Sequence, residues 1–171
     1  LCSLINQKRN YRIEEMKKMM LLAVCIMMTA LSYAHGLSTE LFGTRYAEAL
    51  RNIESILGKP AKVEADKVIY NKVEYEGMTW DEAYFKFSDG QLVEARFYSR
   101  QAGKAKALHH LEEVAKVLKR SHAITKDYED KHTAFYKGGR SPMDFGHLFT
   151  IFVSPYKGGW TTQLRYGPFE F

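Results

Sequence analysis

The sequence predicts an α+β domain in which two copies of a helix-plus-three-strand unit, at about 42–100 and 101–167, form one antiparallel sheet with both helices on one face. Three observations predict this fold class. Two segments have apolar residues at helical spacing, strand-like segments follow each of them, and turns containing glycine separate most of these strands. No Gly/Ser-rich linker divides the chain, so we expect a single domain.

The first predicted helix lies within residues 43–60, GTRYAEALRNIESILGKP. Its apolar residues recur at i, i+3, i+4 and i+7 and form one stripe: Tyr46, Ala49, Leu50, Ile53, Ile56 and Leu57. Thr44 can cap the first turn, Gly58 can adopt the left-handed conformation after the last turn, and Pro60 prevents continuation. Both ends of this helix are therefore predicted from local residues.

Three strands are predicted after this helix, at 67–75, 79–87 and 91–98. These segments are rich in β-branched and aromatic residues, and turn dipeptides at 76–77 and 89–90 separate them. We therefore expect an antiparallel three-stranded meander.

A second helix is predicted within residues 103–120, where apolar residues return to helical spacing and basic residues occupy the last turn. Three further strands are expected after it: about 132–137, 145–154 and 160–166. The Gly-Gly pairs that follow Lys137 and Lys157 are interpreted as tight turns between strands.

The N-terminal segment is predicted to be removed from the folded domain. Residues 16–34 combine a short charged region, a small-residue cleavage site and an apolar run shorter than the ~20 residues of a spanning helix. Residues 1–15 precede the first methionine and are interpreted as upstream sequence outside the native product. We therefore expect an exported protein, periplasmic or extracellular, whose domain comprises residues 35–171.

The composition of the remaining 137 residues differs from that of the whole chain. Both cysteines, Cys2 and Cys25, lie in the N-terminal segment, so no disulfide is expected. Lys and Arg fall from 25 to 20, and Asp and Glu from 20 to 18. Because the basic character belongs largely to the presequence, nucleic acid is not an expected partner. No transmembrane span is expected after cleavage.

Strand alternation predicts an aromatic and charged surface on the sheet. If Ala83, Phe85 and Phe87 point toward the helices, the intervening side chains point away. Glu82, Lys86, Leu92 and Glu94 point outward on the same count, and the predicted binding set on this face is Tyr70, Trp80, Tyr84, Arg96 and Tyr98. These residue types are enriched at binding hot spots, so we predict that this set binds a partner. Two alternatives stay open: the rings shield one another across strands, or residues 167–171 cover them.

The sequence contains no recognisable catalytic constellation or cofactor motif, so we expect a non-enzyme that holds no cofactor or metal. His109 and Glu113 are four residues apart on the second helix, but a metal site needs a further ligand. The candidates for it occur at no recognisable spacing: His122, His132 and His147. Ser141 is not a nucleophile elbow, because Met143 replaces the required glycine.

The pattern G-T-x4-A-L-x2-I-x3-L-G-K-P, followed by a sheet and then a second helix and sheet, resembles two families. These are the tandem αβ repeats of β-lactamase-inhibitor proteins and the small outer-membrane-assembly lipoprotein domain called SmpA or BamE. The chain also looks like related exported bacterial proteins of unknown function. The resemblance spans residues 42–166 and implies a non-catalytic module that presents the open face of its sheet to another protein. Membrane anchoring and lactamase inhibition do not carry over, because the predicted mature chain lacks the cysteines that those families use.

We therefore predict an exported, non-catalytic binding module of the inhibitor or envelope-assembly type, whose partner is a protein of the cell envelope. A first alternative is a small-ligand or glycan-binding protein that uses the same Trp and Tyr rings. A second is a hydrolase that uses the His-rich second half of the chain.

Overall fold

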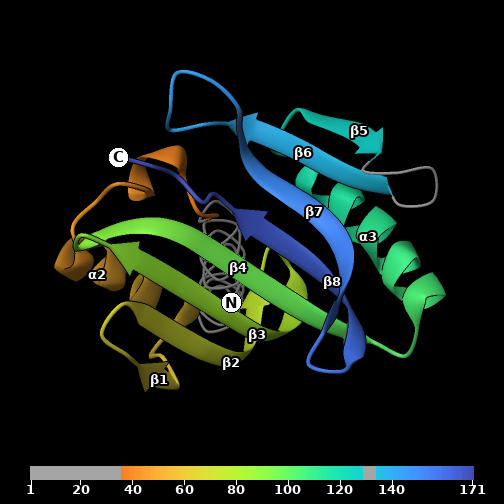
Figure 1. The fold of residues 1–171 in the computed structure, drawn as a ribbon, viewed down its shortest axis with the longest axis horizontal. Helices are drawn as coiled ribbons and strands as arrows, with labels where there is room; N and C mark the ends of the chain where they lie inside the picture. The colour runs from red at the N-terminus through yellow and green to blue at the C-terminus, as the bar shows by residue number, and fades with distance from the viewer. Residues whose placement is uncertain (1–35, 129–133) are drawn as a thin grey trace, which may run out of the picture. The chain divides into compact units, whose positions relative to one another are not determined.

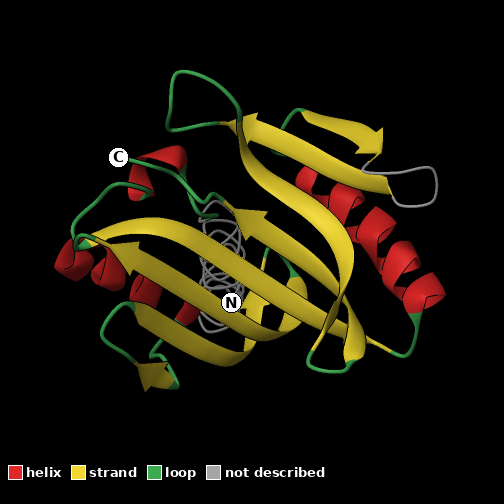
Figure 2. Cartoon of the chain, in the orientation of Figure 1, coloured by secondary structure: helices red, strands yellow, loops and turns green. Residues whose placement is uncertain are grey.

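The computed structural model describes residues 36–128 and 134–171, so the predicted upstream and signal segments lie outside the described residues. The described chain forms a short 3₁₀ helix, two α-helices and eight strands (Figures 1 and 2). Their bounds are η2 (Thr39–Leu41), α2 (Tyr46–Leu57), β1 (Lys62–Val63), β2 (Lys67–Tyr75), β3 (Met78–Ser88), β4 (Gln91–Gln101), α3 (Lys104–Leu118), β5 (Ile124–Tyr128), β6 (Ala134–Arg140), β7 (His147–Tyr156) and β8 (Gly159–Tyr166).

The eight described strands form one antiparallel sheet in the order β1-β2-β3-β4-β8-β7-β6-β5. Each α-helix is followed along the chain by four strands, and the two sets of strands meet where β4 pairs with β8. The predicted α+β class is confirmed. The predicted count of three strands after each helix is wrong, because the edge strands β1 and β5 were missed. β1 has two residues, and β5 (ITKDY) is short and largely polar, so neither has a strand pattern.

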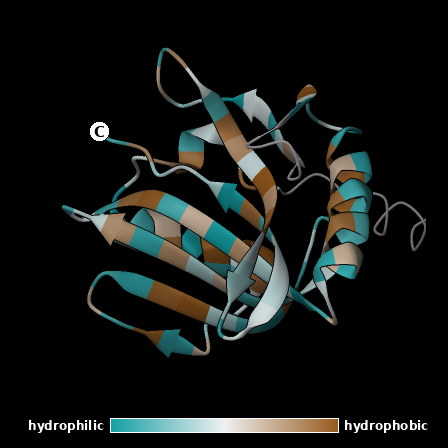
Figure 3. Ribbon diagram, turned by 45° about the vertical axis from the view of Figure 1, so that its right-hand side comes forward, coloured by the Kyte–Doolittle hydropathy of each residue, from teal (hydrophilic) through white to brown (hydrophobic). Residues whose placement is uncertain are grey.

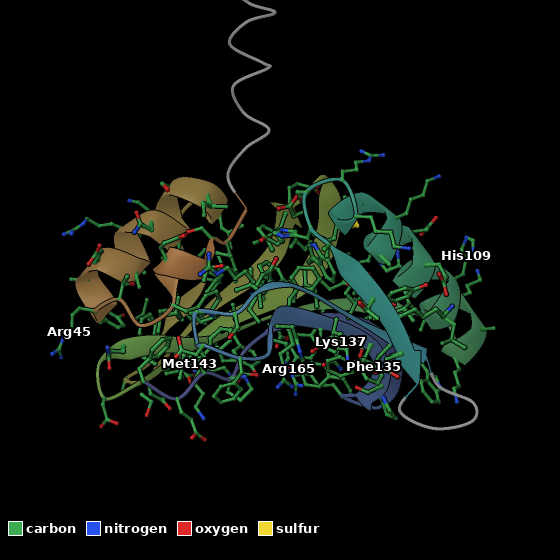
Figure 4. The ribbon with its side chains drawn as sticks, turned by 90° about the horizontal axis from the view of Figure 1, so that it is seen from above. Arg45, His109, Phe135, Lys137, Met143 and Arg165 are labelled. Carbon is green, nitrogen blue, oxygen red and sulfur yellow. The ribbon has the colours of Figure 1, made fainter. Side chains whose placement is uncertain are left out.

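Both α-helices pack on the sheet through their apolar stripes. α2 contacts β2 and β4, whereas α3 contacts β4, β7 and β8. In Figure 4 both helices lie above the sheet, and Figure 3 shows apolar and polar residues interleaved along α3. The residues of α3 that enter the core are Ala107, Leu111, Val114, Ala115 and Leu118. No helix in the described part of the chain is long and apolar enough to cross a membrane.

The C-terminal end of α2 follows the predicted signals, but its first turn does not. Gly58 has a positive φ of 78° and stands directly after the last helical residue. The N-cap is Arg45, without a side-chain cap. The Thr44 hydroxyl donates instead to the carbonyl of Leu41 at 2.7 Å, so the predicted Thr44 cap is wrong.

Aromatic rings connect the two halves of the sheet inside the core. The Tyr75 ring of β2 stacks on Phe97 of β4 with their centroids 4.4 Å apart. The Tyr75 hydroxyl lies 2.8 Å from the hydroxyl of Tyr166 on β8 and accepts a hydrogen bond from the backbone N–H of Leu37. The two buried hydroxyls therefore satisfy each other away from water.

Strand alternation changes phase in the middle of β2 and β3. Buried Tyr70 and Val73 are three residues apart, as are buried Trp80 and Ala83 on the paired strand. In a regular strand, residues three apart face opposite sides of the sheet. Lys72 has a positive φ of 51° between the two β2 residues, and this left-handed backbone accompanies the change of phase.

Tyr70 and Trp80 both lie in the core, so their predicted outward orientation is wrong, and the phase change accounts for Trp80. Trp80 is fully buried, its indole N–H donates to the carbonyl of Tyr75, and its ring lies 6.3 Å from that of His110 on α3. Tyr70 is 2% exposed and packs edge-on against Phe85. Strict alternation counted from Phe85 placed Trp80 on the wrong face. Tyr70 faces inward because it pairs with Ala83, and the sequence did not reveal this strand register.

The two Gly-Gly pairs have different structures. Lys157 and Gly158, with φ of 49° and 78°, form the predicted turn between β7 and β8. Gly138 and Gly139 instead lie inside β6, so the predicted turn there is wrong. A Cβ at Gly138 would lie 2.6 Å from the carbonyl oxygen of Ala123, so this glycine permits a close backbone approach.

Trp80→Ala is expected to lower the free energy of unfolding by about 3 to 5 kcal/mol, because it empties a fully buried position. Lys86→Ala, at an exposed position of the same strand, should change it by less than about 0.5 kcal/mol. Urea denaturation followed by circular dichroism measures both values. Similar small losses for the two variants would contradict the inward position of Trp80.

Candidate binding face of the sheet

The side of the sheet away from the α-helices, here called the outer face, carries a row of polar and aromatic side chains across five strands. The paired residues, here called the central row, are Tyr84, Arg96, Arg165, Thr150 and Lys137. Their neighbours along each strand, such as Phe85, Phe97 and Tyr166, belong to the core, so the row faces the other way. Figure 4 shows Lys137 and Arg165 on the side of the sheet opposite the helices.

One end of the central row contains a nearly buried carboxylate. Glu94 is 6% exposed and accepts a hydrogen bond from Arg96 Nε at 3.1 Å and another from the Tyr84 hydroxyl at 3.3 Å. Lys67 lies over the Tyr84 ring, with its Nζ 4.0 Å from the ring centroid. Burial and the nearby Glu94 carboxylate raise the pKa of Tyr84, so its hydroxyl stays neutral and can donate.

The end of the β7–β8 hairpin folds over another part of the outer face. The Tyr156 ring stacks on Tyr98 with centroids 4.0 Å apart, and its hydroxyl donates to Glu82 of β3 at 2.8 Å. Lys157 forms an ion pair with Glu82 at 2.6 Å. Burial opposes the ionisation of Glu82, but the hydrogen bonds from Lys157 and Tyr156 lower its pKa below the ordinary value. These contacts attach the hairpin to β3 and β4.

The other end of the central row is mainly cationic. The guanidinium of Arg165 lies over the Phe152 ring, 5.3 Å from its centroid, and Lys137 pairs with Asp127 at 2.9 Å. His147 Nε2 lies 2.9 Å from the Thr150 hydroxyl. Burial, together with the charges of Lys137 and Arg165, lowers the pKa of His147, so its ring is neutral at pH 7.

Two polar atoms of β8 have no hydrogen-bond partner among the described residues. Arg165 Nε is buried without an acceptor. Gln163 is 2% exposed; its Nε2 donates to Ser154 and Thr161, but its Oε1 lacks a donor. Because buried polar groups in folded proteins are normally satisfied, these two atoms mark the outer face of β8 as incomplete.

The structure separates the five predicted partner-binding residues. Tyr84 and Arg96 lie half-buried on the outer face, and Tyr98 lies there but is only 3% exposed beneath Tyr156. Tyr70 and Trp80 belong to the core, as described above. Ring shielding, one of the two alternatives, therefore applies to Tyr98.

The second alternative was that residues 167–171 cover the aromatic rings of the outer face, and these residues do not lie over Tyr84 or Tyr98. Phe169 packs edge-on against Phe42 in the hydrophobic core, and its backbone N–H donates to the carbonyl of Val93. Phe171 lies against Gly43 rather than over the central row.

Sequence reasoning missed Arg165 and the cover formed by Tyr156, and it placed Glu94 on the outward face without including it in the binding set. Glu94 and Arg165 had a partial signal, because both alternate with apolar residues in predicted strands. The contact between Tyr156 and Glu82 had none, because 74 residues separate them. Only the hydrogen-bonded arrangement of β3, β4, β8 and β7 reveals it.

The metal candidates do not come together. His109 Nε2 lies 3.6 Å from Glu113, and both side chains are mostly exposed. The His122 ring packs against Phe149 in the core, and His132 lies outside the described residues. Within residues 36–128 and 134–171, no group of three or more His, Cys, Asp and Glu side chains could hold a metal ion.

A pocket of about 430 Å³ lies beside the connection between β6 and β7. Its lining residues are Thr39, Glu40, Arg140, Ser141, Pro142, Met143, Asp144, Phe145 and Gly146. Ser141 Oγ accepts a hydrogen bond from the backbone N–H of Met143 at 3.1 Å, and no described histidine bonds to it. The pocket therefore does not pair this hydroxyl with a general base.

Comparison with known proteins finds no match: no family model, curated protein or solved structure resembles the chain closely enough to assign it.

Arg96→Met is expected to lower the free energy of unfolding by about 2 to 3 kcal/mol, because the nearly buried Glu94 would lose its ion-pair partner and keep only the hydrogen bond from Tyr84. Adding Glu94→Gln should recover most of this loss. Arg100→Met, at an exposed position of β4, is the matched control. Urea denaturation at pH 7 measures all variants, and a double variant no more stable than the single one would contradict the coupling.

Proposed function

We propose that this protein is an exported, non-catalytic module that binds a protein partner through the outer face of its sheet. The observation that carries the proposal is the incomplete outer face of β8, where Arg165 and Gln163 leave polar atoms without partners. Half-buried Tyr84 and Phe152 flank the central cations with aromatic surface. Aromatic rings beside arginine are typical of binding hot spots.

The arrangement of the strands supports a tandem-repeat origin for this face. Each α-helix precedes four consecutive strands, and the sheet order is symmetrical about the junction of β4 and β8. We infer that two similar units share one sheet and both place their helix on its inner side. This inference agrees with the family resemblance, which remains a proposal, as does assignment to the inhibitor or envelope-assembly type.

A protein partner fits the outer face better than a glycan does. The glycan alternative depended on stacking platforms that included Trp80 and Tyr70, and both rings lie in the core. Tyr98 is occupied by Tyr156. The rings that stay accessible alternate with charged side chains, as in the polar and aromatic mixture of protein interfaces.

Export is proposed from residues 16–34, which combine a charged start, an apolar run and a small-residue cleavage site. N-terminal sequencing of the protein recovered from its host is expected to begin near His35. A mature product that still begins near Met16 would contradict export by cleavage.

Phe152→Ala and Tyr84→Ala are each expected to weaken partner binding by about 2 kcal/mol, roughly thirty-fold, because both rings border the central cations. The protein, tagged, is first used to isolate its partner from the native cell envelope for identification by mass spectrometry. Affinities of the variants for the purified partner are then measured by calorimetry.

His109→Ala is the control for these variants, because His109 is an exposed residue of α3 (Figure 4). It should leave the affinity unchanged. Unchanged circular dichroism must accompany any loss of binding. Equal affinity of the wild-type protein and both outer-face variants would contradict binding through this face.

A further inference from the structure

Arg165 differs from the other cations of the central row because no residue in the described part of the chain supplies a counter-charge for it. Arg96 is paired with Glu94, and Lys137 is paired with Asp127. Within the described residues, no carboxylate lies within ion-pair distance of Arg165, and its Nε has no hydrogen-bond acceptor. The guanidinium is nevertheless held in place, because it lies over the Phe152 ring.

The surroundings of Arg165 favour an anion. Thr150 is the register partner of both Arg165 and Lys137, so two cations flank one hydroxyl on three adjacent strands. Arg96 is paired with Arg165 on the other side. Like charges on adjacent strands are unfavourable for folding. Glu94 and Asp127 offset the charges of Arg96 and Lys137, and a bound anion would offset the charge of Arg165.

The same surroundings indicate which kind of anion would fit beside Arg165. Anionic membranes are recognised by clusters of several uncompensated basic residues, and nucleic acids by many phosphate contacts. Here two of the three cations of the central row, Arg96 and Lys137, already have carboxylate partners. The guanidinium N–H donors of Arg165 are therefore the ones left for an anion. A guanidinium fork matches a single carboxylate in a bidentate arrangement. The adjoining Phe152 ring suits an apolar neighbour of that carboxylate.

We propose that Arg165, supported by Phe152 and reinforced by Lys137, receives a carboxylate from an acidic segment of the protein that binds the outer face. This inference rests on the proposed function and specifies the chemistry of the partner. Charge complementarity of this kind sets specificity and the association rate. The interaction should therefore weaken as salt rises.

The test uses a capped pentapeptide with a central phenylalanine flanked by glutamates, titrated into ¹⁵N-labelled protein and followed by NMR. The amide resonances of the central row are expected to shift saturably. Replacing every glutamate of the peptide by glutamine, or making the Arg165→Gln variant, should weaken binding by about tenfold or more. Raising salt from about 50 mM to about 300 mM should also weaken it severalfold.

Arg51→Gln provides the matched control, because it removes the same charge from an exposed position of α2. It should change the affinity by less than about twofold. Lys137→Gln should cause a smaller loss than Arg165→Gln and serves as a second test if Arg165→Gln fails to fold. Absence of a saturable shift, or equal effects of Arg165→Gln and Arg51→Gln, would overturn the proposal.

Vesicles of phosphatidylcholine with about 30% phosphatidylglycerol provide the competing arm. Arg165-dependent binding to these vesicles without binding to the peptide would overturn the proposal in favour of a lipid surface. Measuring the affinity of the Phe152→Ala and Arg165→Gln variants for the purified partner tests this inference separately from the proposed function. If Phe152→Ala weakens partner binding but Arg165→Gln does not, the carboxylate inference fails and binding through the outer face stands. If neither variant weakens partner binding, the carboxylate inference and binding through the outer face both fail.

Discussion

The antiparallel pairing of β4 with β8 is the interaction on which the rest of the structure depends. Seven residue pairs, from Ala95 opposite Tyr166 to Gln101 opposite Trp160, join the two sets of four strands. Without this junction each half would present a long unpaired edge. On the inner side the junction brings Phe97 and Tyr75 to Tyr166, and on the outer side it sets Arg96 beside Arg165. The pairing of β4 with β8 therefore positions both the core rings on the inner side and the candidate site on the outer side.

The protein itself occupies part of its outer face. The β7–β8 hairpin places Tyr156 over Tyr98 and attaches Lys157 to Glu82, so this region is a satisfied polar and aromatic network. Such networks hold strands in a defined arrangement because each member restricts the others. The neighbouring region around Arg165 lacks this completion. The region under Tyr156 is satisfied and the region around Arg165 is not. Arg165, rather than the whole outer face, is therefore the centre of the candidate site.

Backbone irregularity decides how much aromatic surface the outer face retains. The left-handed residue Lys72 accompanies a phase change that turns Trp80 toward α3. A second irregularity, at Lys86 and Phe87, shifts the register of β3 against β4, so that Leu92 rather than Val93 belongs to the core cluster. The core gains Trp80 through the first shift and Leu92 through the second. The candidate site is consequently smaller and more charged than regular alternation predicts.

The sequence by itself determined the elements whose signals are local. The helix that ends just before Gly58 and most of the strands follow from periodicity and turn residues, because these reflect interactions between residues close in the chain. Part of the candidate site was predictable in the same way: Tyr84 and Arg96 occupy the predicted face. β5 was not predictable, because a short polar segment becomes a strand only when β6 is beside it.

Only the tertiary structure decided which side chains reach the outer face and which of them have partners. The phase change beside left-handed Lys72 turns Trp80 inward, and pairing with Ala83 turns Tyr70 inward. Neither orientation can be read from alternation along a single strand. The isolation of Arg165 depends on which carboxylates the paired strands bring near it. Those neighbours come from distant parts of the chain, so their arrangement is set by strand pairing and core packing rather than by local propensity.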